Sequence, residues 1–264
     1  MCIRDRTRVI PFPIAKVGTS YISYEDYLFQ LRHYIHYYES QQQIDFSSKS
    51  GKAQLANYKK QALQQIITDA YVKQLASKYH VSVSGQEVTD EINLVRSEDK
   101  LGSTNQELSS VLNQFWGWSM TDFQRELKQE LLAQKVVSTL DNATHSRAQA
   151  ALTALKQGAT FASVAAQYSD DASTKSSGGQ FGFTITVEKS NVAPQTLQTL
   201  LALKVGQVSG IINLGNALEI DMLDSNNNGQ IQASHILFNF QSITAFTNPL
   251  AKTEKPSIYI NQKI

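Results

Sequence analysis

The last histidine of the sequence, His235, lies in an apolar run, Ala233-Ser-His-Ile-Leu237. Another polar group, Asp170-Asp171, opens a glycine-rich loop. An imidazole changes charge near neutral pH, and a carboxylate is a strong hydrogen-bond acceptor. In a pocket, such groups stabilise charge in a bound molecule. The residues alone leave two interpretations open. His235 is either a site residue or a strand histidine bonded to a neighbouring hydroxyl, and the aspartates either serve a site or bond their own backbone.

Other motifs offer different chemistry. Asp224–Ile231 matches the first eight positions of a calcium-binding EF-hand loop. The twelfth position should be glutamate but is His235, and strand-like runs flank the segment, so a turn at Asn228-Gly229 explains the same residues. A calcium-stabilised structural module therefore stays a weaker alternative. His33 and His36 share a helix face without a further ligand at suitable spacing, and we expect no metal. No phosphate loop, nucleophile elbow or Rossmann fingerprint is present, and we expect no cofactor.

The composition predicts a folded protein without a strong electrostatic field. Hydrophobic residues make up 41% of the 264 residues and charged residues 18%, and the net charge is +1. We therefore expect no nucleic-acid partner. The single cysteine, Cys2, excludes an intrachain disulfide and a cysteine-built zinc site. The start, Met1-Cys-Ile-Arg-Asp-Arg6, resembles translated adapter sequence, so residues 1–7 are taken as foreign. We expect any signal or membrane anchor to have been lost upstream.

Residues 20–140 predict an all-helical domain. One helix begins near Tyr24, and a long helix spans about Ala53 to Tyr79 with an apolar face. Pairs with capping-box spacing open the helices, namely Ser23 with Asp26, Ser84 with Glu87, Thr104 with Glu107, and Ser119 with Asp122. The polar segment Asp141–Ser146 marks a domain boundary.

The region from residue 146 predicts an α+β domain. Its elements follow the order helix, helix, strand, helix, strand, strand, strand, which indicates an antiparallel sheet with helices. Near its end, Leu218, Ile220 and Met222 alternate with Glu219 and Asp221, a pattern typical of a half-buried strand. Asn228-Gly229 predicts a hairpin that joins this strand to the run ending at Phe240.

Residues 146–223 resemble a parvulin-type peptidyl-prolyl isomerase. The resemblance rests on the order and spacing of five pieces: Ala154-Leu-Lys-Gln-Gly158, Phe161–Ser169, Asp170-Asp171, Gly178-Gly-Gln-Phe-Gly182 and Leu203–Ser209. The N-terminal part, beginning at Ala15–Tyr24, is similar to the helical chaperone domain of SurA-like and PrsA-like foldases. Together they imply a chaperone domain at 8–142, an isomerase domain at 143–240 and a C-terminal tail at 241–264.

The order of the pieces departs from the family. Parvulin domains begin with a strand that carries a histidine in a motif like A-S-H-I-L, yet Lys135–Ser146 offers no such strand. The motif stands at Ala233–Leu237, after the last strand. We therefore predict a circularly permuted domain whose first strand is residues 230–240. The rival hypothesis is that His235 opens a second repeat, but only about two dozen residues follow Phe240.

The resemblance also assigns a site. Isomerising an X–Pro bond needs an apolar surface for the proline ring and polar groups that favour the twisted amide. By position, His235 is the first site histidine and Asp171 the acid, and the substrate-binding positions are Phe181, Phe183, Leu197 and Ser209. No second histidine is present at or beside Ala217, where the family carries one.

Two functions follow from the resemblance. The first is a foldase that isomerises prolyl bonds in unfolded polypeptide clients. The alternative is a non-catalytic chaperone that only binds extended clients. Either function implies a protein outside the cytoplasm, at the cell surface or in the periplasm. Any membrane anchor would lie in the segment expected upstream.

Overall fold

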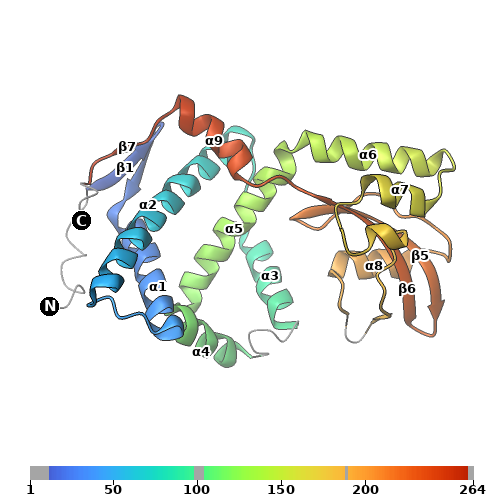
Figure 1. Ribbon diagram of the computed structural model, residues 1–264, viewed down its shortest axis with the longest axis horizontal. Helices are drawn as coiled ribbons and strands as arrows, with labels where there is room; N and C mark the ends of the chain where they lie inside the picture. The colour runs from blue at the N-terminus through green and yellow to red at the C-terminus, as the bar shows by residue number, and fades with distance from the viewer. Residues whose placement is uncertain (1–11, 98–103, 188–189, 261–264) are drawn as a thin grey trace. The chain divides into compact units, whose positions relative to one another are not determined.

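The computed structural model describes residues 12–97, 104–187 and 190–260, and the chain divides into two compact units (Figure 1). The first unit comprises the residues up to Val136 and those from Ile243 onward, and the second is Val137–Ser242. The second unit is therefore inserted into the first. Residues 243–260, part of the segment expected to form a tail, instead belong to the first unit, while the segment 1–7 lies outside the described residues.

The first unit consists mainly of helices and carries a small antiparallel sheet. Its elements are β1 (Pro13–Val17), β2 (Ser20–Ser23), α1 (Tyr24–Gln42), α2 (Lys49–Lys78), α3 (Gly85–Ser97), α4 (Asn105–Trp116), α5 (Met120–Leu140, which enters the second unit), α9 (Thr244–Thr253) and β7 (Ser257–Ile258). The strands lie in the order β2-β1-β7. The prediction of an all-helical domain missed this sheet because its strands are short and one comes from the other end of the chain.

The helix starts in this unit follow the predicted capping pairs. Thr104 and Glu107 form a reciprocal capping box at α4. Ser84 and Glu87 bond in the same way at the start of α3. Each pair satisfies backbone N–H groups that have no partner inside the helix. The pairs Ser23 with Asp26 and Ser119 with Asp122 are likewise bonded.

The returning C-terminal segment is fixed to the first unit by hydrogen bonds. The Tyr71 hydroxyl on α2 donates to the Glu254 carbonyl at 2.6 Å, and the Gln74 amide donates to the Glu254 carboxylate at 2.7 Å. Strand β7 pairs with β1, with Ala15 opposite Ile258. Leu250 packs against the core formed by β1, α1 and α2. The unit is therefore built from both ends of the chain.

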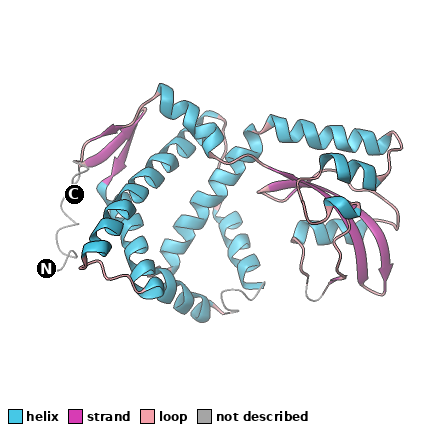
Figure 2. Ribbon diagram, in the orientation of Figure 1, coloured by secondary structure: helices cyan, strands magenta, loops and turns pink. Residues whose placement is uncertain are grey.

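The second unit is an α+β domain, as predicted, with helices on both faces of an antiparallel sheet (Figure 2). Its elements are α6 (Asn142–Lys156), α7 (Phe161–Tyr168), the 3₁₀ turn η2 (Lys175–Ser177), β3 (Ile185–Thr186), α8 (Pro194–Ala202), β4 (Ile212–Asn213), β5 (Ala217–Asn227) and β6 (Gln230–Asn239). The strand order is β3-β6-β5-β4, so β6 is an inner strand. None of the helices in the described part of the chain is long and apolar enough to cross a bilayer.

The long strand β5 is buried on both of its faces. Leu218 and Ile220 pack with α6 and α7, and Leu223 belongs to a second cluster with Leu200 of α8. The half-buried strand predicted from the alternation is therefore wrong. Glu219, on the face that was expected to be polar and open, is only 3% exposed. A buried charge needs a partner, so this face requires a polar network.

Candidate functional site

The β5–β6 hairpin sets the position of His235. Its turn residues Asn228 and Gly229 have φ of 53° and 84°, the left-handed conformation expected for this tight turn. The pairing shifts by one residue between Leu223 and Ser225. This bulge places His235 opposite Asp221, whereas an unbroken register would place it opposite Met222. His235 therefore shares a sheet face with acidic residues rather than with the apolar core.

The glycine loop lies against β6 beside His235. The His235 N–H donates to the Gly179 carbonyl at 2.8 Å, and the Phe181 N–H donates to the Ala233 carbonyl at 3.1 Å. A Cβ on Gly179 would lie 2.4 Å from the His235 carbonyl oxygen, and the residue has φ of +88°. Only glycine fits both constraints at this position.

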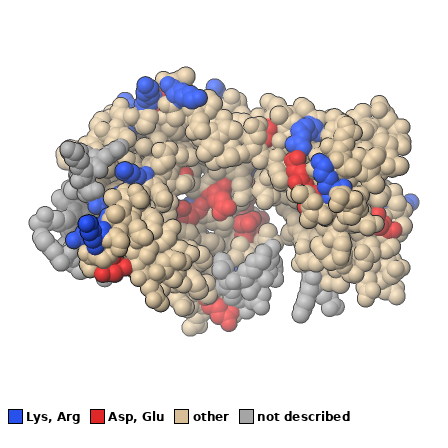
Figure 3. Space-filling view, in the orientation of Figure 1, with Lys and Arg blue, Asp and Glu red and all other residues tan. Residues whose placement is uncertain are grey.

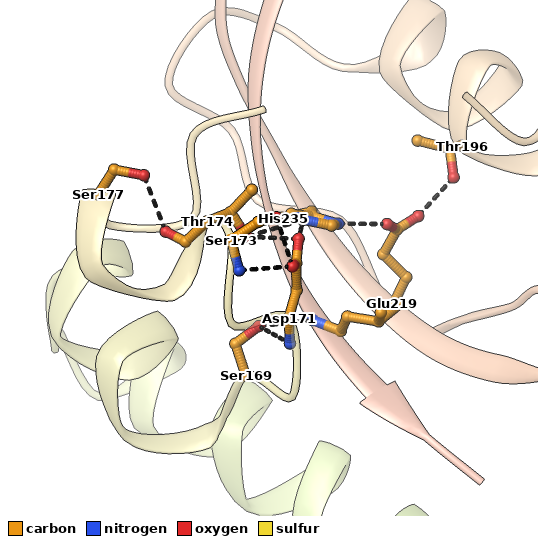
Figure 4. A network of polar contacts seen from close by, with 9 residues as sticks. Ser169, Asp171, Ser173, Thr174, Ser177, Thr196, Glu219 and His235 are labelled. Carbon is orange, nitrogen blue, oxygen red and sulfur yellow. Dashed lines mark hydrogen bonds and ion pairs between the residues drawn. The ribbon is translucent and has the colours of Figure 1, made fainter. Parts of the chain in front are cut away.

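The imidazole of His235 lies between two carboxylates (Figure 4). Nε2 lies 2.9 Å from Asp171 Oδ2 and 3.0 Å from the Thr174 hydroxyl. Nδ1 lies 2.7 Å from Glu219 Oε1. The structure therefore brings together the two residues assigned from sequence, His235 and Asp171, and adds Glu219 and Thr174.

Asp171 is held as an ionised acceptor. Its Oδ1 accepts from the N–H of Ser173 at 2.9 Å and from the Ser173 hydroxyl at 2.6 Å, and Oδ2 accepts from the Thr174 hydroxyl at 2.7 Å. Partial burial opposes the charge of this carboxylate, but these donors and His235 together hold its pKa well below the usual range. The neighbouring Asp170 has a different role, because it pairs with Arg147 at 2.6 Å and accepts from the Asn239 N–H.

The two carboxylates also set the charge of His235. Burial alone would lower the pKa of this imidazole, but the hydrogen bonds and charges of Glu219 and Asp171 outweigh burial and raise it. Asp221, opposite His235, is fully buried, and neither of its carboxyl oxygens has a hydrogen-bond partner. Burial and the nearby Glu219 raise the pKa of Asp221, which favours its neutral form.

Sequence reasoning missed Glu219, Asp221 and Thr174. The alternation along β5 predicted a polar side, but not that α8 covers it. The Thr196 hydroxyl of α8 donates to Glu219 Oε2. Ala217, near which a second histidine was expected, is buried two residues before Glu219. The signal that could have found Glu219 is an acidic residue in an otherwise apolar strand within hairpin reach of His235.

The substrate-binding residues assigned from sequence are not all in one place. The Phe181 ring stacks on His235 with centroids 4.2 Å apart and contacts Phe183 at 5.4 Å. Phe181 and Leu197 pack against the same apolar cluster. Ser209 differs, because its hydroxyl accepts from the Asp221 N–H and donates to the Gly210 carbonyl. Its polar groups are therefore used inside the fold.

The EF-hand-like segment forms the hairpin itself. Asp224 accepts from the Ser234 hydroxyl at 2.8 Å, and Asn226 accepts from the Gly229 N–H at 3.1 Å. Both side chains therefore have partners inside the hairpin. Within the described ranges, no group of three histidine, cysteine, aspartate or glutamate residues is arranged to hold a metal.

Comparison with known proteins identifies the family. A family model described as SurA-like N-terminal domain matches residues 3–137, about half of the chain. A model described as PPIC-type PPIase domain matches residues 131–225. The chain belongs to the family with a SurA-like N-terminal domain and carries a parvulin-type isomerase domain. It is a peptidyl-prolyl cis–trans isomerase, a foldase enzyme.

A solved structure of a peptidylprolyl isomerase, PrsA from Bacillus anthracis, is 18% identical in sequence. The match covers 72% of this chain and 86% of that chain, with a TM-score of 0.23. The search of curated proteins found no match.

The raised pKa of His235 predicts a defined dependence of stability on pH. The folded unit binds the His235 proton more tightly than the unfolded chain, so this stabilisation is complete below the ordinary pKa of 6.5 and is lost as pH rises through the raised value. The lowered pKa of Asp171 contributes folding stability at pH values above its ordinary pKa of 3.8. That stability is lost as pH falls through the lowered pKa. We expect the His235 ring resonance to titrate with a midpoint above 6.5.

NMR titration of the ring and urea unfolding at several pH values measure the two effects. In His235→Asn, which cannot ionise, the loss of stability at high pH should disappear. A ring midpoint at or below 6.5 would contradict the prediction.

Proposed function

We propose that this isomerase acts on prolyl bonds in unfolded or extended polypeptide clients, with Asp171 and His235 at the reacting amide. The observation that carries the proposal is the Asp171 carboxylate held 2.9 Å from the His235 imidazole, with the Phe181 ring stacked on the imidazole. No nucleophile or cofactor is needed, because the reaction only rotates one C–N bond.

The carboxylate suits the change in charge during rotation. In the planar amide, resonance places negative charge on the carbonyl oxygen, and twisting the bond removes it. A fixed negative group near that oxygen therefore disfavours the planar form relative to the twisted form. The side chain of Asp171 is 20% exposed, against 7% for His235 and 4% for Glu219. Asp171 is thus the charged group of the network that a client can reach most easily.

The apolar side chains supply a surface for the proline ring. Phe181 covers His235, and Phe183, which contacts Phe181, is 39% exposed. Leu197 of α8 packs against the same apolar cluster as Phe181. We assign Phe181, Phe183 and Leu197 to the substrate-binding surface, while the internal hydrogen bonds of Ser209 favour a supporting role.

The first unit would hold the client chain. It contains a pocket of about 400 Å³ lined both by apolar residues such as Ile66 and Leu132 and by charged residues such as Asp69, Lys73 and Glu126. Much of the face in Figure 3 carries neither acidic nor basic side chains, but acidic side chains gather near its centre. We further propose that the protein works outside the cytoplasm, since unfolded chains that arrive there need a foldase of this domain combination.

We also propose that the isomerase domain is circularly permuted, with β6 as the displaced first strand. The match to the isomerase family ends at residue 225, before β6 begins. The end of β6 lies beside the start of α6, because the Thr144 hydroxyl donates to the Asn239 carbonyl at 3.3 Å and the Gln241 N–H donates to Asp141 at 2.8 Å. A direct connection from β6 to α6 would therefore be short.

The permutation predicts that this order can be reversed. Residues 230–240 would be moved ahead of Asp141, with one Gly/Ser linker of about 15 residues from Leu140 to Gln230 and a second of the same length from Asn227 to Gln241, each long enough to run along one strand of the hairpin. We expect the rearranged chain to fold with a melting temperature within about 5 °C of the parent. Circular dichroism and calorimetry measure this. An unfolded isomerase unit would contradict the permutation.

The proposed catalytic pair predicts large losses of activity. We expect Asp171→Ala and His235→Ala each to lower kcat/KM on a proline peptide by about 10²-fold, the size typical of losing one preorganised polar group. Asp170→Asn is the matched control, because this side chain bonds Arg147 and not His235 and the asparagine keeps an acceptor for the Asn239 N–H, so it should keep most of the activity.

Equal rates for all four proteins would sink the assignment of the pair. If suppression of client aggregation persisted in that case, the non-catalytic chaperone function would be favoured.

The substrate surface predicts a separation of binding from stability. Phe183→Ala should raise KM about three- to tenfold, since a partly exposed phenylalanine contributes less than a fully buried one. Ser209→Ala should leave KM unchanged and lower the unfolding free energy by about 1–3 kcal/mol, because the buried Asp221 N–H loses its acceptor. Steady-state kinetics and urea unfolding distinguish the two. A raised KM in Ser209→Ala would place that residue at the client.

A further inference from the structure

We propose that Glu219 is a positioning residue for the isomerase, whose carboxylate holds His235 as a doubly protonated, oriented cation beside Asp171. This inference rests on the proposed function and assigns a role to a residue two positions after Ala217, near which the sequence lacks a second histidine.

Glu219 is built into the site by two different elements. Its Oε1 lies 2.7 Å from His235 Nδ1 on β6, and its Oε2 accepts from the Thr196 hydroxyl on α8. The side chain is 4% exposed. A buried carboxylate with a donor at each oxygen cannot rotate without breaking one of these bonds. Glu219 therefore fixes the direction of the imidazole as well as its charge.

The contacts at Nε2 show where one proton lies. The Thr174 hydroxyl has a single proton and donates it to Asp171 at 2.7 Å. Toward Nε2, 3.0 Å away, that oxygen can then only accept. Asp171 Oδ2, 2.9 Å from Nε2, is also an acceptor. Nε2 must therefore carry a proton.

The contact at Nδ1 places the second proton. A neutral imidazole with its proton on Nε2 would point a bare lone pair at Glu219 Oε1. The 2.7 Å separation instead fits a charge-assisted N–H···O bond. His235 as a cation satisfies both carboxylates at once.

The other titratable group packed near His235 does not compete for this role. Asp221 lies opposite His235 in the pairing of β5 with β6, and both of its carboxyl oxygens are buried without a hydrogen-bond partner, a position that favours the neutral carboxyl. Asp171 and Glu219 therefore bond the imidazole directly, and Asp221 does not. Asp221→Asn, which replaces a neutral carboxyl with a neutral amide of the same shape, is a matched control on the same strand.

The test compares Glu219→Gln, Glu219→Asp and Asp221→Asn with the parent. Glu219→Gln keeps an acceptor but removes the charge, so His235 should lose its second proton at lower pH. We expect kcat at pH 8 to fall at least about tenfold, the factor of one charge-assisted hydrogen bond, with KM little changed and less loss at pH 5. Glu219→Asp should retain part of the high-pH activity, and Asp221→Asn should keep the parent profile.

Nitrogen NMR of the His235 ring gives a readout that does not depend on activity. The parent should show two protonated ring nitrogens at pH 7, and Glu219→Gln should show one over part of the same range. Signals are assigned by their loss in His235→Asn. A neutral, singly protonated His235 in the parent, or an unmoved titration in a folded Glu219→Gln or Glu219→Asp, would overturn the proposal.

The nitrogen NMR result can be told apart from a failure of the proposed function. An inactive parent with a doubly protonated His235 would count against the catalytic assignment and leave the role of Glu219 in setting the His235 charge supported.

Discussion

The isomerase unit depends on one constraint, the neutralisation of charge buried between β5 and β6. Glu219 lies on the inner strand pair and is nearly inaccessible to water, and a carboxylate in that position is costly unless it is paired. His235 supplies the pairing cation, and Asp171 balances the other side of the ring. Strand β6, the glycine loop and α8 each contribute a partner, so the fold and the site are stabilised by the same contacts.

That constraint explains why the backbone around His235 is held tightly by its neighbours and leaves the imidazole little room to move. Gly179 approaches the His235 carbonyl so closely that no side chain fits, and this contact brings Phe181 onto the imidazole. Asp170 attaches the start of the same loop to β6 through the Asn239 N–H. The two neighbouring aspartates thus divide their roles, with Asp170 fixing the loop and Asp171 facing the ring. The loop is rigid where the chemistry needs fixed dipoles.

Local features of the fold could be predicted from sequence, and long-range ones could not. Thr104 with Glu107 caps a helix through neighbours three residues apart, and Asn228-Gly229 makes its turn from its own backbone preferences. Glu219 was missed for a different reason. A two-residue turn with unbroken pairing places His235 opposite Met222, on the apolar face, and the bulge after Leu223 reverses this. Nor does alternation along β5 reveal that α8 covers its polar side, because that depends on packing between distant segments.

Prolyl isomerisation tolerates a site in which a carboxylate, rather than a second histidine, bonds the first histidine. The reaction neither transfers a proton permanently nor forms a covalent intermediate, so the network must only keep its shape and charge while one bond rotates. A neutral partner and an uncharged imidazole can meet that requirement, and so can a carboxylate and an imidazolium. This chain has the carboxylate and the imidazolium, because Nδ1 and Nε2 of His235 both face acceptors. The missing histidine therefore changes the protonation of the site without removing the ordered groups that act on the amide.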